Sequence, residues 1–233
     1  GAFMGDTVVI FDLEADGKHK NNDFTYTQVT VACAMVLDAQ ACLKARTRAE
    51  RRAVVANGKA FHWWRHEMSG PDKRGEPMAE LLKLFDDAAL IVAYNGLAYD
   101  FPLLLKHYAG KDRYKRFWSH RLKTHDPFSR IKEVVGYWPK LDELLTANKL
   151  QTKSSTGLEA IQMWYDGRHD ELLAYCTDDV RLLAELVMLP QLVCPKATIL
   201  PETIFGIRPA LVGSTCPLGS PAPSPKGSPT VAA

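Results

Sequence analysis

The chain has no apolar run that approaches the roughly 20 residues of a membrane-spanning helix, and we therefore expect no contact with a membrane. Its five cysteines are an odd number and include no Cys-x-x-Cys pair. This argues against a disulfide framework or a zinc ribbon, and it favours reduced thiols in an intracellular, cytoplasmic setting. No charged-then-apolar leader is visible, so we expect no secretion signal.

The sequence also has little net charge, because 29 Lys and Arg residues nearly balance 27 Asp and Glu residues. Any contact with nucleic acid must then come from local clusters of charge. The strongest basic cluster lies in residues 43–55, which we expect to form one short helix. It is either a solvated helical face or a track for nucleic acid, and both interpretations stay open.

Composition divides the chain into three parts. Residues 1–5 are expected to be the remnant of an expression tag with a short lead-in. Residues 6–195 have the apolar and charged content of one globular domain. Residues 196–233 are rich in Pro, Ser and Gly, which predicts a flexible C-terminal tail.

The first candidate for a functional feature is an apolar run, residues 8–11, that ends in two acids. The run predicts a buried strand, and alternation along a strand points Asp12 and Glu14 to the same side while Leu13 points to the other. Two converging carboxylates repel each other unless a cation lies between them, and oxygen ligands suit Mg²⁺ or Mn²⁺. The alternative is a strand that simply ends in solvated acids.

The remaining elements alternate strands with helices and then become mostly helical. Further strands are expected over residues 26–37, antiparallel to the first, and over residues 60–64, 90–94 and 122–125. Asp126-Pro127 is typical of a helix start, so Asp126 is interpreted as a helix cap. Helices are expected over residues 75–87, 101–105, 112–120, 141–150, 156–165 and 169–189.

Asp100 and Asp179 are two further acids whose positions are compatible with a functional site. Asp100 follows a sharp Asn-Gly turn at the junction between a strand and a helix, where a helix cap is the alternative interpretation. Tyr175 and Asp179 are four residues apart and share one face of the last long helix. Asp179 borders the buried stripe of that helix and therefore needs a partner, whereas Asp178 falls on a solvent-facing row.

Three motifs thus follow in order: Asp-x-Glu after the first strand, Asn-Gly-x-x-Tyr-Asp after a later strand, and Tyr-x-x-x-Asp on the last long helix. Together they resemble the DEDD superfamily of 3′–5′ exonucleases, which includes polymerase proofreading domains and RNase D-like enzymes. The resemblance covers residues from about 6 to 190. One branch of the superfamily has His five residues before the last Asp, where this chain has Ala174. Tyr175 instead matches the branch called DEDDy.

The resemblance implies an RNase H-like α/β fold, with a mixed five-stranded sheet in the order 3-2-1-4-5, strand 2 antiparallel, and a helix-rich C-terminal half of the chain. It also implies a hydrolase, a nuclease that releases nucleoside 5′-monophosphates from the 3′ end of single-stranded nucleic acid. DNA is the favoured substrate. The alternatives are an exoribonuclease that trims RNA and a catalytically silent nucleic-acid-binding module. No protein partner is implied, and a monomer is expected.

Carried over by position, the family pattern assigns roles to four acids and one tyrosine, and five neighbouring residues are candidates for contact with the substrate. Four would bind two divalent ions, Mg²⁺ or Mn²⁺: Asp12, Glu14, Asp100 and Asp179. Tyr175 would orient the attacking water, because an unperturbed phenol with a pKa near about 10 is a poor general base. Contacts to the substrate are expected from five residues: Leu13, Lys18, Lys20, Asn95 and Tyr99. For Lys18 and Lys20, solvated loop charges are the alternative.

Overall fold

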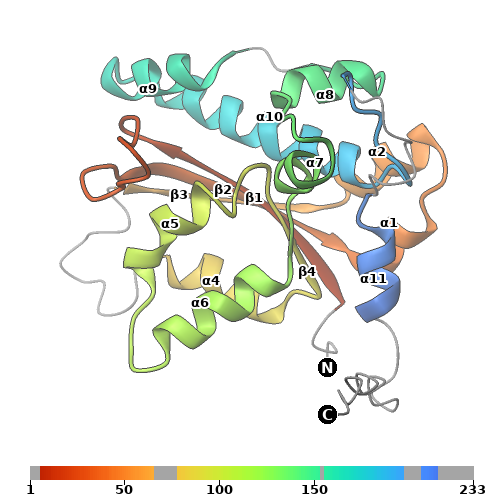
Figure 1. Ribbon diagram of the computed structural model, residues 1–233, viewed down its shortest axis with the longest axis horizontal. Helices are drawn as coiled ribbons and strands as arrows, with labels where there is room; N and C mark the ends of the chain where they lie inside the picture. The colour runs from red at the N-terminus through yellow and green to blue at the C-terminus, as the bar shows by residue number, and fades with distance from the viewer. Residues whose placement is uncertain (1–5, 66–77, 153–154, 197–205, 215–233) are drawn as a thin grey trace, which may run out of the picture.

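The computed structural model describes residues 6–65, 78–152, 155–196 and 206–214. Its centre is one five-stranded sheet in the order β3-β2-β1-β4-β5 (Figure 1). The strands are β1 (Thr7–Ala15), β2 (Val29–Asp38), β3 (Lys59–Trp64), β4 (Leu90–Val92) and β5 (Thr124–His125). β2 runs antiparallel to both neighbours, whereas β4 and β5 run parallel to β1. The expected order and the antiparallel second strand are confirmed.

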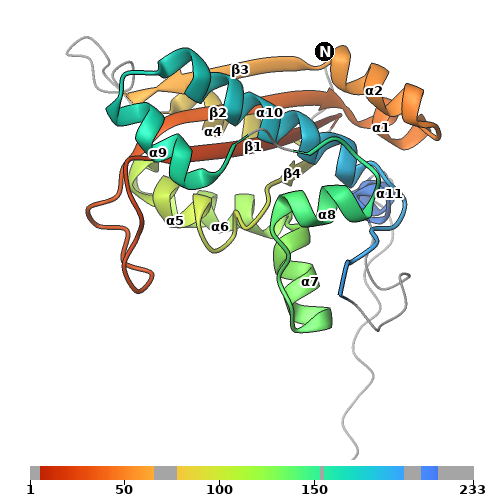
Figure 2. The ribbon, with the colours of Figure 1, turned by 90° about the horizontal axis from the view of Figure 1, so that it is seen from above.

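Helices cover both faces of this sheet. They are α1 (Ala39–Lys44), α2 (Arg48–Ala56), α4 (Ala79–Asp87), α5 (Asp100–Leu104), the 3₁₀ helix η1 (Leu105–His107), α6 (Arg113–Leu122), α7 (Pro127–Val135), α8 (Leu141–Ala147), α9 (Gly157–Tyr165), α10 (His169–Val187) and α11 (Arg208–Ser214). In Figure 1, α8, α9 and α10 lie above the sheet and α4, α5 and α6 below it. Figure 2 shows α7 and α8 on the opposite side of the molecule from the edge strand β3.

The sequence of β1 lacks polar alternation because both faces of the strand are buried. Val8 and Ile10 pack into the core on the α10 side, whereas Val9 and Phe11 pack into the core on the α4 and α5 side. A strand covered on both faces is apolar at every position. The same alternation turns Asp12 and Glu14 toward α10, and it turns Leu13 toward α5.

The basic segment differs from its prediction, because residues 43–55 contain parts of two helices. Thr47 begins α2 with a capping box, in which its hydroxyl accepts from the Glu50 N–H and the Glu50 carboxylate accepts from the Thr47 N–H. Asp38 caps α1 by accepting from the Ala41 N–H at 2.7 Å. Each helix therefore has its own N-terminal cap. The prediction of one helix rested on the basic residues alone and did not consider these two caps.

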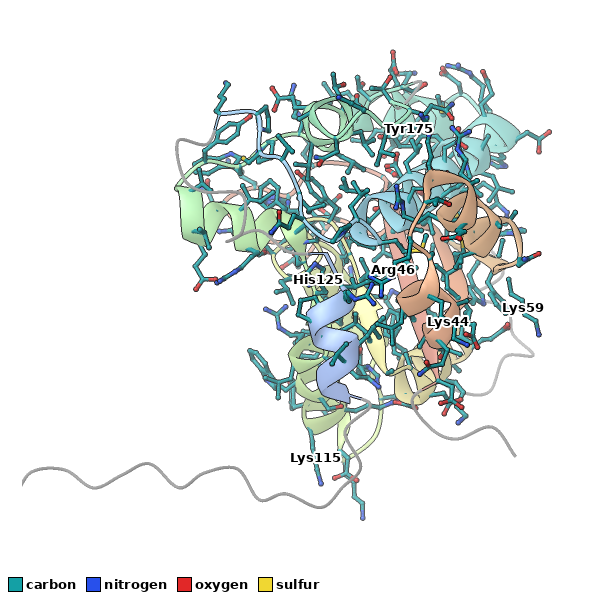
Figure 3. All side chains as sticks on the ribbon, turned by 90° about the vertical axis from the view of Figure 1, so that its right-hand side faces the viewer. Lys44, Arg46, Lys59, Lys115, His125 and Tyr175 are labelled. Carbon is teal, nitrogen blue, oxygen red and sulfur yellow. The ribbon has the colours of Figure 1, made fainter. Side chains whose placement is uncertain are left out.

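The basic segment also lies far along the sheet from the acids of β1. Asp38, which precedes α1, pairs with Thr7 at the start of β1, whereas Asp12 and Glu14 lie near its end. Figure 3 shows Lys44 and Arg46 on α1 and its following loop, well away from Tyr175. A nucleic-acid track on this segment would thus not continue directly from the acidic site.

The C-terminal region contains an element that composition did not predict. Within the segment expected to be a flexible tail, residues 206–214 are described and include α11, whose Leu211 is buried together with Ile207. The Ile207 N–H donates to the carbonyl of Val187 at 2.8 Å, which holds this segment to the end of α10. The rest of the expected tail, the lead-in 1–5 and the expected helix start at 75–77 lie outside the described residues.

No helix within the described ranges combines the length and the apolar character that crossing a bilayer requires.

Candidate active site

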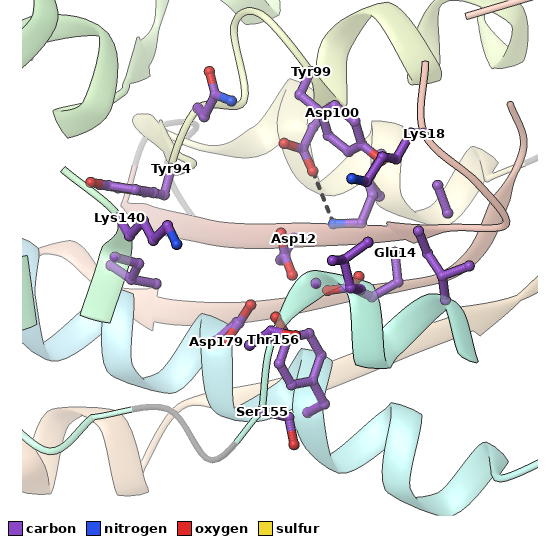
Figure 4. Close-up of a pocket in the computed structure, with 18 of the residues that line it drawn as sticks. Asp12, Glu14, Lys18, Tyr94, Tyr99, Asp100, Lys140, Ser155, Thr156 and Asp179 are labelled. Atoms are coloured by element: carbon purple, nitrogen blue, oxygen red, sulfur yellow. Dashed lines mark hydrogen bonds between the residues drawn. The ribbon is translucent and has the colours of Figure 1, made fainter. Parts of the chain in front are cut away.

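A cavity of about 680 Å³ opens at the end of β1, between α5 on one side and α9 and α10 on the other (Figure 4). Every predicted site residue except Lys20 lines it: Asp12, Leu13, Glu14, Lys18, Asn95, Tyr99, Asp100, Tyr175 and Asp179. Lys20 is exposed in a turn that closes on Asp23, away from this lining. The structure therefore gathers residues from all three motifs around one space.

Asp12 occupies the middle of this arrangement. Figure 4 shows its carboxylate between Asp100, which comes from α5, and Asp179, which comes from α10. Strand alternation orients Asp12 and Glu14 toward the α10 side, as the sequence predicts. The alternative of a strand ending in fully solvated acids does not describe this site, because both carboxylates are partly buried and line one cavity together with acids from α5 and α10.

Asp100 is the most deeply buried of the acids, with 2% of its surface exposed. It is the first residue of α5, but its side chain makes no cap for that helix. Its Oδ1 instead accepts a hydrogen bond from the Leu13 N–H at 3.0 Å, which joins the second motif to β1. Burial, and then the nearby charge of Asp12, raise the pKa of Asp100 well above its usual value.

α10 contributes Tyr175 and Asp179, which are 4% and 8% exposed and stand one helical turn apart. Both line the cavity, so the prediction that they share one face of the helix is confirmed. The neighbouring Asp178 is half-exposed and pairs with Arg181 at 3.5 Å, as expected for a solvent-facing position. Two adjacent acids on one helix thus face opposite environments.

The donor atoms fit a hard divalent cation. Within the described ranges, one group of three potential ligands has its donor atoms within 4.8 Å of one another: Asp12, Glu14 and Cys176. Asp100 and Asp179 line the same cavity but stand outside that group. Carboxylates gathered in a partly buried space repel one another unless a cation compensates their charge, and their oxygens suit Mg²⁺ or Mn²⁺.

Cys176 is a site residue that sequence reasoning assigned only to the buried stripe. Its Sγ lies 3.7 Å from the carbonyl oxygen of Asp12 and 3.8 Å from the Oδ2 of the same residue. A thiol is a weak donor, so it fixes the Asp12 carboxylate with little energy. Burial raises the pKa of Cys176 far above its usual value, which keeps it a neutral thiol. Cys176 directly follows Tyr175 and stands three residues before Asp179, and this position in the third motif is the feature from which its place at the site could have been predicted.

Asp126 performs a second role that the sequence did not reveal. It caps α7 as predicted, by accepting from the Ser129 N–H at 3.3 Å. It also accepts from the Asn95 N–H at 2.9 Å and from the Leu97 N–H at 3.1 Å. The carboxylate therefore fixes the loop that carries the second motif. Asn95 follows β4 and Asp126 follows the neighbouring parallel strand β5. This adjacency is the feature from which the contact could have been predicted.

Gly96 is needed in that same loop. A Cβ at this position would lie 2.3 Å from the Cβ of Ala93, closer than two side-chain carbons approach. The preceding Asn95 has a positive φ of 59°, a conformation that Asn tolerates better than most residues. The Asn-Gly pair thus makes the sharp turn that brings Asp100 back to β1.

Segments that carry no motif form the remaining wall of the cavity. Lys140 and Leu141 come from the start of α8, and Thr156 and Leu158 come from the start of α9. On the opposite rim, the ring of His19 lies 4.6 Å from that of Phe24 and 5.9 Å from that of Tyr99. Sequence reasoning could not find the α8 and α9 residues, because only the tertiary packing brings them to the cavity.

No family model matches the chain, and no curated protein matches it. Solved structures that are similar include a family B DNA polymerase from the hyperthermophilic archaeon Pyrobaculum calidifontis, at 16% identity and a TM-score of 0.49, with 78% of this chain and 24% of that chain covered. A product-bound exonuclease I is 16% identical with a TM-score of 0.41, over 73% of this chain and 46% of that chain. A structure of SSB/exonuclease I in complex with an inhibitor is 15% identical with a TM-score of 0.44, and the match covers 79% of this chain and 41% of that chain. The chain therefore spans between a quarter and a half of the length of these proteins.

Proposed function

We propose that this chain is a metal-dependent 3′–5′ exonuclease of the DEDDy type. It would remove nucleoside 5′-monophosphates from the 3′ end of single-stranded nucleic acid, with DNA favoured over RNA. The observation that carries the proposal is the convergence on one cavity of three motifs that lie about 75 to 80 residues apart along the chain. Tyr175 and Asp179 approach Asp12 from α10, and Asp100 approaches it from α5.

Asp12, Glu14 and Asp179 are the residues that would hold one Mg²⁺ or Mn²⁺, and Asp12 with Asp100 would hold a second. When bound, such ions supply an activated water and stabilise the leaving oxygen of a phosphodiester. The buried carboxylates support this role, because Asp100 has a raised pKa and gains a compensating charge when a cation binds beside it. Without a cation, these acids would lie together at an electrostatic cost.

The other lining residues act on the nucleotide and on the water. The Tyr175 phenol, which lines the cavity with Asp179, would hydrogen-bond to the attacking water. Leu13, Asn95 and Tyr99 line the space that a terminal nucleotide would occupy. Lys18 and Lys140 provide positive charge for its phosphates from opposite walls of the cavity.

A gel time course tests the proposed reaction. Single-stranded DNA and RNA of one sequence, labelled at the 5′ end, are incubated with Mg²⁺, with Mn²⁺ or with EDTA. We expect a metal-dependent ladder that shortens from the 3′ end and disappears in Asp12→Ala and Asp179→Ala. Asp178→Ala is the matched control, because it removes an acid of the same helix that pairs with Arg181 outside the cavity.

The outcomes separate the alternatives. Faster loss of the DNA ladder supports DNA as the favoured substrate, and faster loss of the RNA ladder supports the exoribonuclease. Binding of both strands without cleavage would overturn the enzyme in favour of a silent binding module. Equal loss of activity in Asp178→Ala and Asp179→Ala would mean that the cavity is not the site of reaction.

A further inference from the structure

An exposed tryptophan lies two residues along the chain from a residue that lines the cavity, and it has no part in the proposed reaction. Trp138 is 55% exposed in the loop that joins α7 to α8. Two residues further on, Lys140 lines the cavity, so Trp138 is at most about 8 Å of chain from its wall. A large exposed aromatic ring at such a place is available to stack on a nucleic-acid base.

The loop holds this ring in a fixed position. Pro139, which follows it, is buried, and its carbonyl oxygen accepts a hydrogen bond from the hydroxyl of Tyr94, another cavity-lining residue. On either side, Glu143 accepts from the Tyr137 hydroxyl at 3.0 Å and from the Lys140 N–H at 2.9 Å. Because its backbone is already anchored, this loop loses little backbone freedom when its exposed side chain binds a ligand.

The charge around the ring is positive. The Nζ of Lys132 lies 4.9 Å from the centre of the Trp138 ring, and the Nζ of Lys196 lies 5.0 Å from that of Tyr137. Glu133 pairs with Arg130 at 3.2 Å. Glu143 keeps its negative charge, because its two hydrogen bonds in this loop come from neutral donors, and the two lysines together exceed that charge by one. Interleaved aromatic rings and cations are complementary to a strand of stacked bases and phosphates.

We propose that Trp138 stacks on a base of the single strand just outside the cavity, upstream of the 3′-terminal nucleotide, while Lys140 contacts the adjoining phosphate. This inference rests on the proposed function, and it identifies where the strand leaves the active site. The strand passes over the loop between α7 and α8. Stacking on Trp138 holds the penultimate part of the strand while the terminal nucleotide occupies the cavity.

The chain offers a closely matched control. Trp118 on α6 is 56% exposed, and the guanidinium of Arg121 lies 5.1 Å from its ring centre. It therefore equals Trp138 in residue type, in exposure and in having a cation over the ring. It differs in its place, since α6 lies below the sheet whereas α8 lies above it (Figure 1).

The first measurement is binding without turnover. A fluorescent single-stranded DNA of about 12 nucleotides is titrated with the full chain in EDTA, and its anisotropy is recorded. We expect Trp138→Ala to weaken binding about 5- to 100-fold, Trp138→Phe to keep most of the affinity, and Trp118→Ala to change it less than about twofold. In Mg²⁺, Trp138→Ala should raise KM and leave kcat unchanged.

The second measurement identifies the stacked base. DNAs that carry one abasic position at successive distances from the 3′ end are titrated with the wild type and with Trp138→Ala. We expect one abasic position to weaken the wild type and to have no effect on Trp138→Ala, since the two changes remove the same contact. The wild type alone shows which base is held, and the comparison with Trp138→Ala assigns that contact to Trp138.

The results separate this inference from the proposed function. Equal affinity of Trp138→Ala and wild type, or equal losses in Trp138→Ala and Trp118→Ala, would overturn the stacking role while cleavage by the wild type still stands. A wild type that neither binds nor cuts single strands would overturn both.

Discussion

At the scale of single residues, the site depends on where a few polar atoms are held. Asp100 and Asp126 each satisfy backbone N–H groups of a neighbouring segment, Asp100 at Leu13 and Asp126 at Asn95 and Leu97. These bonds join β1, β4 and β5 at the end where the cavity opens. Carboxylates therefore shape the site before any ion or substrate enters it.

Replacing Tyr175 by Phe tests the role of its hydroxyl. We expect kcat to fall about 100-fold, because a water that loses its orienting hydrogen bond is misplaced for attack, while KM stays the same. Steady-state kinetics on single-stranded DNA measures both. Tyr165→Phe is the control, since that hydroxyl donates to the carbonyl of Asp16 outside the reaction. Unchanged kcat in Tyr175→Phe would remove the phenol from the mechanism.

His125 predicts how stability depends on pH. Burial lowers its pKa from 6.5 to about 4, and its Nε2 is buried without a hydrogen-bond partner among the described residues. A histidine whose folded pKa is lowered binds its proton more tightly in the unfolded chain. The resulting stability is thus fully present above about pH 6.5 and is lost as the pH falls toward about 4.

Urea unfolding at about pH 7.5 and about pH 5 measures this dependence. We expect the free energy of unfolding to fall by about 1–2 kcal/mol more in the wild type than in His125→Leu, which has no proton to gain. The exposed His62 provides the control, because His62→Leu should keep the slope of the wild type. Equal slopes in wild type and His125→Leu would contradict the assignment.

At the scale of elements, the sequence predicted what local patterns determine. The apolar run of β1, the Asn-Gly turn and the Asp-Pro start of α7 each carry their signal within a few residues, and each is found where expected. α11 was missed because Leu211 and the preceding Ile207, the two buried apolar residues of this segment, stand among Pro, Gly and Ser. An apolar pair four residues apart is too short a pattern to outweigh that composition.

The docking of α11 is tested by two adjacent substitutions. Leu211 is buried at 1% exposure, whereas Val212 is 53% exposed. Leu211→Ala should lower the free energy of unfolding by about 2–4 kcal/mol, because it leaves a cavity, and Val212→Ala should change it by less than about 0.5 kcal/mol. Denaturant titration of both variants measures the difference. Equal, small effects would mean that α11 does not pack on the domain.

At the scale of the whole molecule, the order of the strands creates the site. β1 occupies the middle of the sheet, with β2 on one side and β4 on the other, so its acidic end is reached from α5 and from α10. The motifs and their order predicted that convergence. The walls from α8 and α9 were not predictable, because their residues reach the cavity only through the packing of the second half of the chain on β1.

This arrangement has a consequence for global stability. A functional cluster of like charges destabilises the fold that contains it when no cation is present. Asp100→Asn removes one buried charge, and the amide oxygen can still accept from the Leu13 N–H. We therefore expect this variant to be more stable than the wild type in EDTA, by about 1–2 kcal/mol, which is about 2–8 °C in Tm for a domain of this size.

The same variant should respond less to metal. Millimolar Mg²⁺ or Mn²⁺ stabilises a protein that binds it only when folded, so the Tm of the wild type should rise with metal concentration. Asp100→Asn should lose most of that rise, whereas Asp178→Asn, outside the cavity, should keep it. Thermal melts at several metal concentrations measure all three proteins without any substrate. The metal-binding role would be contradicted if neither metal changed the Tm of the wild type and if Asp100→Asn were less stable than the wild type in EDTA. The acids would then be stabilised by the protein alone.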